Sequence, residues 1–292
     1  MVILHEIFIE VKNMKFEHID LFPDAENTYL KAYVCDDMPN FKNRRKAVLV
    51  IPGGGYGMVC TDREGDAVAR AFLAAGFNAF VLRYSVKPYA TDFRPLIQAA
   101  VSIKYIRENA ERFSIDPDFV YVIGFSAGGH LAGSAGVMWN HPKVREALGD
   151  APEGIGRPTG MMLCYPVISS GEKAHRGSFL NLCGKESATQ EEMDVYSLEN
   201  LVDGTTPPAF IWHTFADNCV PVENSILMAG ALRENDIPFE LHIYPEGWHG
   251  MSLATPEVLG GKDGKMFEHI RTWFPLAVQW SDTVKPSQHF DF

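Results

Sequence analysis

Hydrophobic residues follow two different spacings along this chain. Some stand in short uninterrupted runs of branched residues, as in residues 46–51. Others recur every three or four positions, as between Phe93 and Ile106. The short runs are typical of strands buried on both faces, and the longer spacing is typical of amphipathic helices. The runs predict strands over residues 15–22, 28–35, 46–51, 78–84, 119–123, 161–165, 209–214 and 239–244.

Helical spacing predicts helices between most of these strands. One begins with Asp62 as its N-cap and ends at Gly76, and a long one runs from Phe93 to about Phe113. Further helices are expected after Ser126 and over residues 221–235 and 266–278. Alternating strands and helices predict an α/β fold, with a mostly parallel central sheet and helices on both faces.

No linker or repeat divides the chain, so residues 1–292 are expected to form a single domain. Residues 166–204 carry few periodic signals. They are expected to lie over the carboxyl ends of the strands, either as a small cap or as an ordinary long connection. Residues 281–292 are polar and are expected to form a loose tail.

Composition narrows the class of protein. A chain of 292 residues can bury a sizeable core, and its five cysteines show no paired spacing typical of a disulfide framework. The net charge of −11 argues against a nucleic-acid or anionic-membrane partner. No signal peptide is visible and no run reaches the roughly 18 apolar residues of a membrane span, so a cytoplasmic location is expected. Homo-oligomerisation stays open.

The segment Gly124-Phe125-Ser126-Ala127-Gly128 fits the pattern G-x-S-x-G. It follows the apolar run 119–123 and precedes the small-residue run 129–135. Strand, sharp turn and helix are the context of a nucleophile elbow, which exposes a serine hydroxyl at a strand end. The alternative is a strand–turn–helix corner without chemistry. The context favours Ser126 as a catalytic nucleophile.

A serine hydroxyl needs a base within hydrogen-bonding reach. His249 stands just past the last predicted strand, with Gly247 and Gly250 nearby to let the loop turn. It is the expected base. Four other histidines stand in predicted strands, on the helix after Ser126 or in the segment 166–204, and are expected to be structural: His130, His175, His213 and His242.

The base in turn needs an acid that fixes its tautomer. Asp217 follows the strand 209–214 and precedes His249 by 32 residues, enough for one helix and one strand. The alternative is that Asp217 only caps the next helix. Asp203 and Glu223 are weaker candidates, because one precedes the strand and the other lies in the helix.

Acyl transfer also needs backbone amides that stabilise an oxyanion. The amide of Ala127, directly after the serine, is one candidate. Gly54 and Gly55 are the others, from the glycine-rich loop 53–56, where Tyr56 is a further option. This loop could instead hold a phosphate, but it matches neither common phosphate-binding glycine motif.

Three segments together carry a family resemblance: Pro52-Gly53-Gly54-Gly55-Tyr56, Gly124-Phe125-Ser126-Ala127-Gly128-Gly129-His130-Leu131-Ala132, and Gly247-Trp248-His249-Gly250, with Asp217 between the last two. They resemble the α/β-hydrolase serine esterases, most of all the acetyl-esterase or xylan-esterase-like branch, which is related to the hormone-sensitive-lipase-like esterases. The lipase-like branch usually has histidine where this chain has Pro52, and that departure favours the sugar-ester branch.

The resemblance implies hydrolysis of short-chain esters, acetyl above all, on a small molecule or an oligosaccharide such as a xylo-oligosaccharide. Tyr56 and Trp248, beside the predicted site, are candidates for substrate contact. No metal or cofactor is expected, because no ligand spacing or cofactor motif occurs. The alternatives are a lipase-like carboxylesterase, a prolyl-oligopeptidase-type serine peptidase and a non-catalytic interaction module on the same fold.

Overall fold

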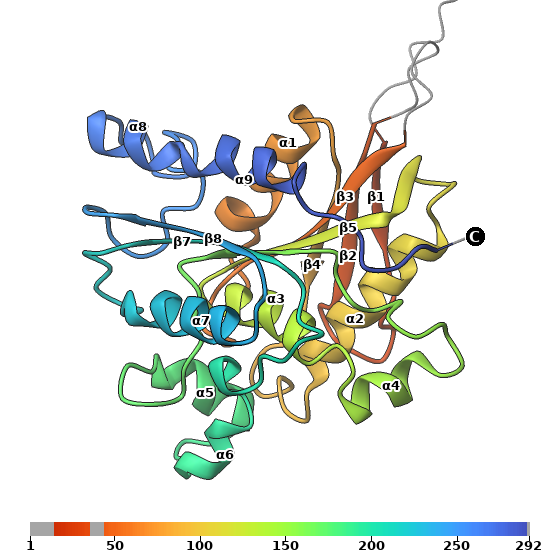
Figure 1. Ribbon diagram of the computed structural model, residues 1–292, viewed down its shortest axis with the longest axis horizontal. Helices are drawn as coiled ribbons and strands as arrows, with labels where there is room; N and C mark the ends of the chain where they lie inside the picture. Colours follow the sequence, from red (N-terminus) through yellow and green to blue (C-terminus); the bar gives the residue numbers. More distant parts are fainter. Residues whose placement is uncertain (1–14, 36–43, 291–292) are drawn as a thin grey trace, which may run out of the picture.

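The computed structural model describes residues 15–35 and 44–290, and its centre is a single sheet (Figure 1). Eight strands form this sheet in the order β1-β2-β4-β3-β5-β6-β7-β8. The six strands from β3 to β8 run parallel, whereas β2 runs antiparallel to both of its neighbours. The strands are β1 Lys15–Ile19, β2 Tyr29–Val34, β3 Arg45–Ile51, β4 Asn78–Arg83, β5 Ile115–Phe125, β6 Met161–Cys164, β7 Ala209–Thr214 and β8 Phe239–Tyr244.

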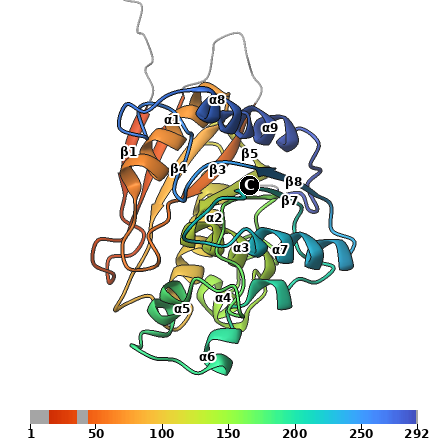
Figure 2. The same ribbon diagram turned by 90° about the vertical axis from the view of Figure 1, so that its left-hand side faces the viewer.

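Helices cover both faces of the sheet. They are α1 Ala67–Ala74, α2 Arg94–Glu108, α3 Ala127–Val137, α4 Pro142–Leu148, α5 Arg176–Cys183, α6 Gln190–Asp194, α7 Glu223–Glu234, α8 Lys265–Arg271 and α9 Trp273–Ser281, with a π-helical turn η1 Asp62–Asp66 and a 3₁₀ turn η2 Leu198–Asn200. In Figure 1, α1, α8 and α9 lie above the sheet, and α2, α3 and α7 lie below it. Figure 2 shows α5 and α6 projecting beyond this lower layer. The predicted α/β fold with a mostly parallel sheet is confirmed.

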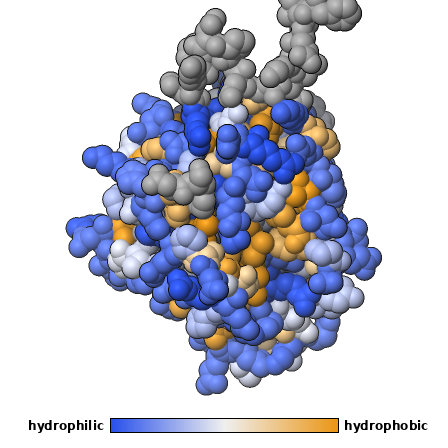
Figure 3. Space-filling model, turned by 90° about the vertical axis from the view of Figure 1, so that its right-hand side faces the viewer, coloured by the Kyte–Doolittle hydropathy of each residue, from blue (hydrophilic) through white to orange (hydrophobic). Residues whose placement is uncertain are grey.

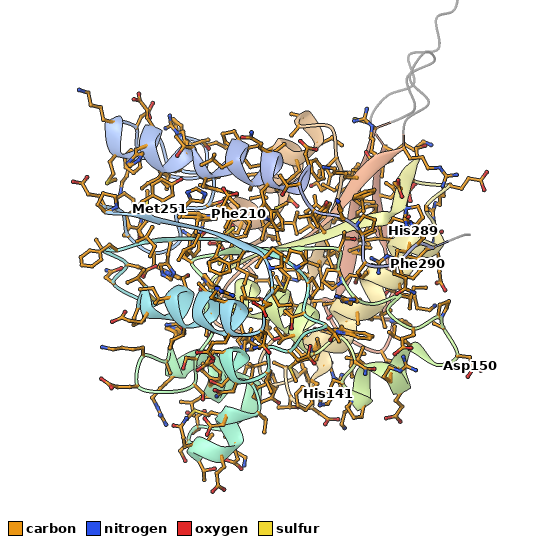
Figure 4. All side chains as sticks on the ribbon, viewed as in Figure 1. His141, Asp150, Phe210, Met251, His289 and Phe290 are labelled. Carbon is orange, nitrogen blue, oxygen red and sulfur yellow. The ribbon has the colours of Figure 1, made fainter. Side chains whose placement is uncertain are left out.

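The strand pattern explains why the sheet has a core on each side. Successive side chains of a strand point to opposite faces. In β5, Val120 and Val122 join the core between the sheet and helices α2 and α3, whereas Tyr121 and Ile123 join the core between the sheet and helices α1, α8 and α9. Figure 4 shows Phe210 and Met251 of this second core between the sheet and the upper helices. Apolar runs without alternation are therefore what this sheet requires.

Figure 3 shows the side of the molecule that carries the end of the described chain. Its largest gathering of hydrophobic residues lies at mid-height, level with the sheet in Figure 1, and hydrophilic residues dominate below.

Two details of the predicted helices are wrong. The helix expected over residues 266–278 is divided into α8 and α9. Pro275 explains the division, because a proline inside a helix lacks an amide donor and its ring clashes with the carbonyl four residues earlier, here that of Arg271. Asp62 is not an N-cap but the first residue of η1, a wider turn that precedes α1.

The described part of the tail that was expected to be loose, residues 281–290, makes specific contacts with the rest of the chain. The Phe290 amide donates to Asp118 Oδ1 at 2.7 Å, and its ring lies 4.4 Å from the Arg107 guanidinium. Gln288 donates to the Glu153 carbonyl at 2.7 Å. Figure 4 places Phe290 beside the N-terminal end of β5. Few apolar residues in a segment predict looseness, but these specific polar contacts hold it in place.

Candidate active site

Ser126 lies in a sharp turn between β5 and α3. Its backbone has φ 55° and ψ −120°, a strained combination for a residue with a side chain. A Cβ on Gly124 would lie 2.0 Å from the Gly128 carbonyl oxygen, and a Cβ on Gly128 would lie 2.1 Å from the Ile51 carbonyl oxygen. The turn therefore needs glycine on both sides of the serine, as the G-x-S-x-G pattern predicted.

The structure brings Ser126, His249 and Asp217 together at the carboxyl ends of β5, β8 and β7. His249 Nε2 lies 2.8 Å from Ser126 Oγ, and His249 Nδ1 lies 2.8 Å from Asp217 Oδ2. Because a carboxylate only accepts hydrogen bonds, Nδ1 carries the proton and Nε2 accepts from the serine hydroxyl. A base, an orienting acid and a hydroxyl thus form one continuous hydrogen-bonded chain.

The Asp217 side chain is fully buried and accepts hydrogen bonds from three donors. Oδ1 accepts from the amides of Cys219 and Val220 at 2.8 and 2.9 Å. Oδ2 accepts from His249 and lies 3.3 Å from His213 Nε2. Burial alone would raise the pKa of Asp217, but the hydrogen bonds from His213 and His249 outweigh it and hold that pKa well below its ordinary value. The carboxylate stays charged beside the imidazole.

The two rival carboxylates bind elsewhere. Asp203 Oδ1 accepts from the amide and the hydroxyl of Thr205, within its own loop. Glu223 Oε1 lies 3.6 Å from Lys173 Nζ. Of the three acidic candidates, only Asp217 reaches His249. Asp217 also does what the helix-capping alternative expected, because it accepts from backbone amides of the turn that leads to α7.

The glycine-rich loop passes directly against the serine. A Cβ on Gly53 would lie 2.9 Å from Ser126 Cβ. Gly54 and Gly55 both have positive φ, 132° and 63°, which glycine adopts without strain. Within residues 15–35 and 44–290, the amides of Gly54 and Gly55 donate no hydrogen bond. Ala127 is the first residue of α3, so its amide has no partner inside that helix. None of these three amides has a hydrogen-bond partner among the described residues.

Tyr56 does not line the site as a substrate contact, so this expectation is corrected. Its side chain is 1% exposed, and its hydroxyl donates to His130 Nδ1 at 2.8 Å. His130 Nε2 donates in turn to the Tyr196 carbonyl at 2.8 Å. Burial lowers the pKa of His130 to about 4, which keeps its ring neutral in this arrangement. Tyr56 and His130 therefore anchor the glycine-rich loop from beneath.

Trp248 is 37% exposed and lies next to His249 in the chain. Its ring packs edge-on against Phe267 of α8, with centroids 5.6 Å apart, and the Lys262 ammonium lies 4.7 Å from the ring. The exposed part of the indole leaves a contact with substrate open, and that role stays a prediction.

Sequence reasoning missed Glu64, which lies in η1 and is 2% exposed. Its Oε2 accepts from the Gly53 amide at 2.8 Å, and its Oε1 accepts from the Tyr165 hydroxyl at 2.9 Å. Tyr165 accepts from the Ser252 amide at 2.9 Å, and its ring lies 5.1 Å from that of His249. One buried carboxylate thus ties the glycine-rich loop to the loop that carries His249.

Burial raises the pKa of Glu64 above its ordinary value, and the hydrogen bonds from Tyr165 and Gly53 oppose the rise. No sequence signal distinguished this residue, because a glutamate in the first turn of a predicted helix is usually exposed. The π-helical turn changes which residues face inward, and that turn could not be predicted from apolar spacing.

The segment 166–204 also contributes to the site. Asn181 of α5 donates from Nδ2 to the Gly55 carbonyl at 2.8 Å. A Cβ on Gly55 would lie 3.9 Å from His175 Cε1, so this imidazole faces the glycine-rich loop. Burial and, to a smaller extent, the charge of His249 lower the pKa of His175. His175 was expected to be structural, but the structure places it beside the predicted oxyanion loop.

No helix in residues 15–35 and 44–290 is long and apolar enough to cross a membrane. Over the same part of the chain, no group of three or more His, Cys, Asp or Glu side chains is arranged to hold a metal ion.

Comparison with known proteins gives similarities over most of the chain. Endo-1,4-beta-xylanase B of Butyrivibrio fibrisolvens is 41% identical over 232 residues, or 78% of this chain and 36% of that protein. An acetylxylan esterase of Xylanibacter ruminicola is 33% identical over 72% of this chain and 42% of that protein. The chain thus spans less than half the length of either relative.

A solved structure, the acetyl ester-xyloside bifunctional hydrolase of Caldicellulosiruptor lactoaceticus, matches with a TM-score of 0.77 and 34% identity. The match covers 91% of this chain and 96% of that one. Residues 37–232 match the family described as BD-FAE, which is more than half of the chain. The chain therefore belongs to the BD-FAE family and has the α/β-hydrolase fold.

Proposed function

We propose that this protein is a serine esterase that removes short acyl groups, acetyl above all, from carbohydrate esters such as acetylated xylo-oligosaccharides. The observation that carries the proposal is the hydrogen-bonded chain from Asp217 through His249 to Ser126, with both distances at 2.8 Å. A hydroxyl, a base and a buried carboxylate in this order are the requirements of acyl transfer through a covalent intermediate.

In the first half-reaction, Ser126 Oγ attacks the ester carbonyl carbon while His249 Nε2 accepts its proton. The carbonyl oxygen becomes an oxyanion, which the amides of Gly54, Gly55 and Ala127 are suited to stabilise. Asp217 stabilises the imidazolium that forms. The intermediate then collapses, the bond to the alcohol oxygen breaks, and His249 returns the proton to the leaving alcohol.

In the second half-reaction, water attacks the acyl-serine carbonyl and gives its proton to His249. The same amides stabilise the second oxyanion. When the bond to Ser126 Oγ breaks, His249 returns the proton to that oxygen and the free carboxylic acid leaves. Glu64 supports both halves by holding the Gly53 amide and, through Tyr165, the loop of His249. We regard it as a positioning residue.

Two observations support sugar esters over long-chain lipids. The similar proteins include an acetylxylan esterase and an acetyl ester-xyloside hydrolase, according to their names. The glycine-rich loop begins with Pro52, where the lipase-like branch has histidine. A non-catalytic role is disfavoured, because such modules usually lack the serine or the histidine.

The test is a comparison of turnover on acetyl, butyryl and octanoyl p-nitrophenyl esters and on acetylated xylo-oligosaccharides. A small acyl pocket loses about 1–3 kcal/mol for each extra methylene. Activity should therefore fall steeply beyond butyryl, and acetylated oligosaccharides should be deacetylated. Octanoyl esters cleaved as fast as acetyl esters would assign the protein to the lipase-like side instead.

A further inference from the structure

A cavity of about 470 Å³ opens at the carboxyl end of β4. We call it the β4 cavity. Its walls come from the turn between β1 and β2, from the residues after β4, and from Val59, which follows the glycine-rich loop. Its charged and aromatic lining includes Asp24, Glu26, Arg83, Tyr89 and Arg94. None of these side chains takes part in the proposed ester chemistry.

Two arginines bring positive charge to the β4 cavity without a partner among the residues that the structure describes. Within residues 15–35 and 44–290, neither Arg83 nor Arg94 forms an ion pair or a side-chain hydrogen bond. Lys87 also lines the cavity but is paired with Glu186 at 2.9 Å. Arg83 is only partly exposed, so part of its hydration is lost. An anionic ligand would supply acceptors that the described residues do not.

The β4 cavity is attached to the proposed oxyanion loop. Tyr84, in its wall, donates its hydroxyl to the Pro52 carbonyl at 2.8 Å. The Lys87 amide donates to the Tyr56 carbonyl at 2.8 Å. In the sheet, β3 is the single strand between β4 and β5, which carries Ser126. The strands β4 and β5 therefore lie two strand spacings apart, about 10 Å, which is within the length of a short oligosaccharide.

The other side chains suit a sugar ring. Tyr89 is 56% exposed and offers an apolar ring face with a polar edge. Asp24 and Glu26 are carboxylates that line the same cavity without pairing with either arginine; Glu26 Oε1 accepts from Asn27 Nδ2 at 3.4 Å, and the remaining carboxylate oxygens can accept from sugar hydroxyls. A guanidinium, by contrast, is suited to a carboxylate, which it can bind through two parallel hydrogen bonds.

We propose that the β4 cavity binds an acidic sugar, a hexuronate unit of the same oligosaccharide whose acetyl ester is held at Ser126. This inference rests on the proposed function and adds a substrate class to it. The carboxylate of the uronate would bind Arg83 and Arg94, and its ring would lie against Tyr89. The protein would then prefer acetylated xylo-oligosaccharides that carry uronate side groups.

The test measures kcat/KM on p-nitrophenyl acetate, on a neutral acetylated xylo-oligosaccharide, and on one of equal length that carries a uronate. The readout is the acidic-to-neutral ratio within each protein, so a difference in the amount of folded protein cancels. The wild type should prefer the acidic substrate by about tenfold or more, as expected for charge-assisted hydrogen bonds. Arg83→Gln and Arg94→Gln should each lower that ratio several-fold, mainly through KM.

Arg233→Gln is the matched control, because Arg233 is an exposed arginine of α7 that pairs with Asp236. It should leave the ratio unchanged. A wild type that cleaves p-nitrophenyl acetate but shows no acidic preference overturns the inference and leaves the proposed function intact. A preference that survives both arginine substitutions overturns it as well. If the protein cleaves none of the three esters, the proposed function itself is overturned.

Discussion

Replacement of Asp217 by asparagine should remove most of the activity, and the structure says why. The carboxylate accepts two backbone amides on Oδ1, and on Oδ2 it faces Nδ1 of His249 and Nε2 of His213. An amide has one acceptor oxygen and one NH₂ donor. In either orientation, the NH₂ of the asparagine faces two other donors. The simplest relief is for His249 to move its proton from Nδ1 to Nε2.

That tautomer cannot accept the proton of Ser126, so the nucleophile loses its base. Changing a triad aspartate to asparagine costs about 10²–10⁴ in turnover, or about 3–5 kcal/mol of transition-state stabilisation. The measurement is kcat and KM for Asp217→Asn on p-nitrophenyl acetate, beside Asp203→Asn and Glu223→Gln. We expect KM to change by less than about threefold, since substrate contacts are retained.

Asp217 is not the triad acid if Asp217→Asn keeps near-normal kcat while Asp203→Asn or Glu223→Gln loses most of its activity. The acid role would then pass to that neighbour. Stability gives a second readout, because a buried NH₂ without an acceptor costs about 1–3 kcal/mol. A variant that is inactive but still folds cooperatively, with a moderately lowered Tm, agrees with the structure.

Three further predictions follow from contacts around the site. Glu64→Gln leaves one acceptor for the two donors Gly53 and Tyr165, so kcat should fall about tenfold with KM nearly unchanged, whereas the exposed neighbour Asp62→Asn should behave as wild type in the same assay. Gly128→Ala should lower the free energy of unfolding by several kcal/mol or prevent folding, because its Cβ would lie 2.1 Å from a carbonyl oxygen. Denaturant titrations measure this, with Gly230→Ala as the control: a Cβ on Gly230 of α7 would have nothing within 4 Å, so this variant should be neutral or more stable by about 0.4–1 kcal/mol. The pKa of Asp217 is lower in the folded protein than its unfolded value of about 3.9, so the charged carboxylate stabilises the fold above that pH, and the stabilisation is lost as pH falls toward the folded pKa. Below about pH 4, the Tm of the wild type should therefore fall more steeply with pH than that of Asp217→Asn. Equal dependence of Tm on pH in the two proteins would contradict the hydrogen bonds to the Asp217 carboxylate.

Much of the fold could be predicted because its signals are local. A strand buried on both faces must be apolar throughout, and the runs in β3 and β7 show this directly. The placement of Ser126, Asp217 and His249 followed from topology, because residues just after parallel strands gather at one edge of the sheet. The conformation of the elbow could be predicted as well, because only glycine fits on both sides of the serine.

The rest depends on packing that no local pattern records. Tyr56 follows three glycines and seemed available to substrate, but its contact with His130 buries it. Glu64 faces inward only because η1 is a π-helical turn. His175 reaches the glycine-rich loop because α5 folds back over it, which the weak periodicity of residues 166–204 did not reveal. Long-range contacts of this kind decide which polar residues surround the site.

The central claim is that Ser126 is the nucleophile of an ester hydrolase, and one labelling experiment tests it most directly. The protein is treated with a serine-directed phosphonate ester, and mass spectrometry of its peptides locates the adduct, with residual p-nitrophenyl acetate turnover measured in parallel. We predict a single adduct on Ser126, loss of turnover in proportion to labelling, and a Ser126→Ala variant that is folded, unlabelled and slower by about 10³-fold or more. A label on another residue, or a Ser126→Ala variant within tenfold of the wild type, would contradict the account.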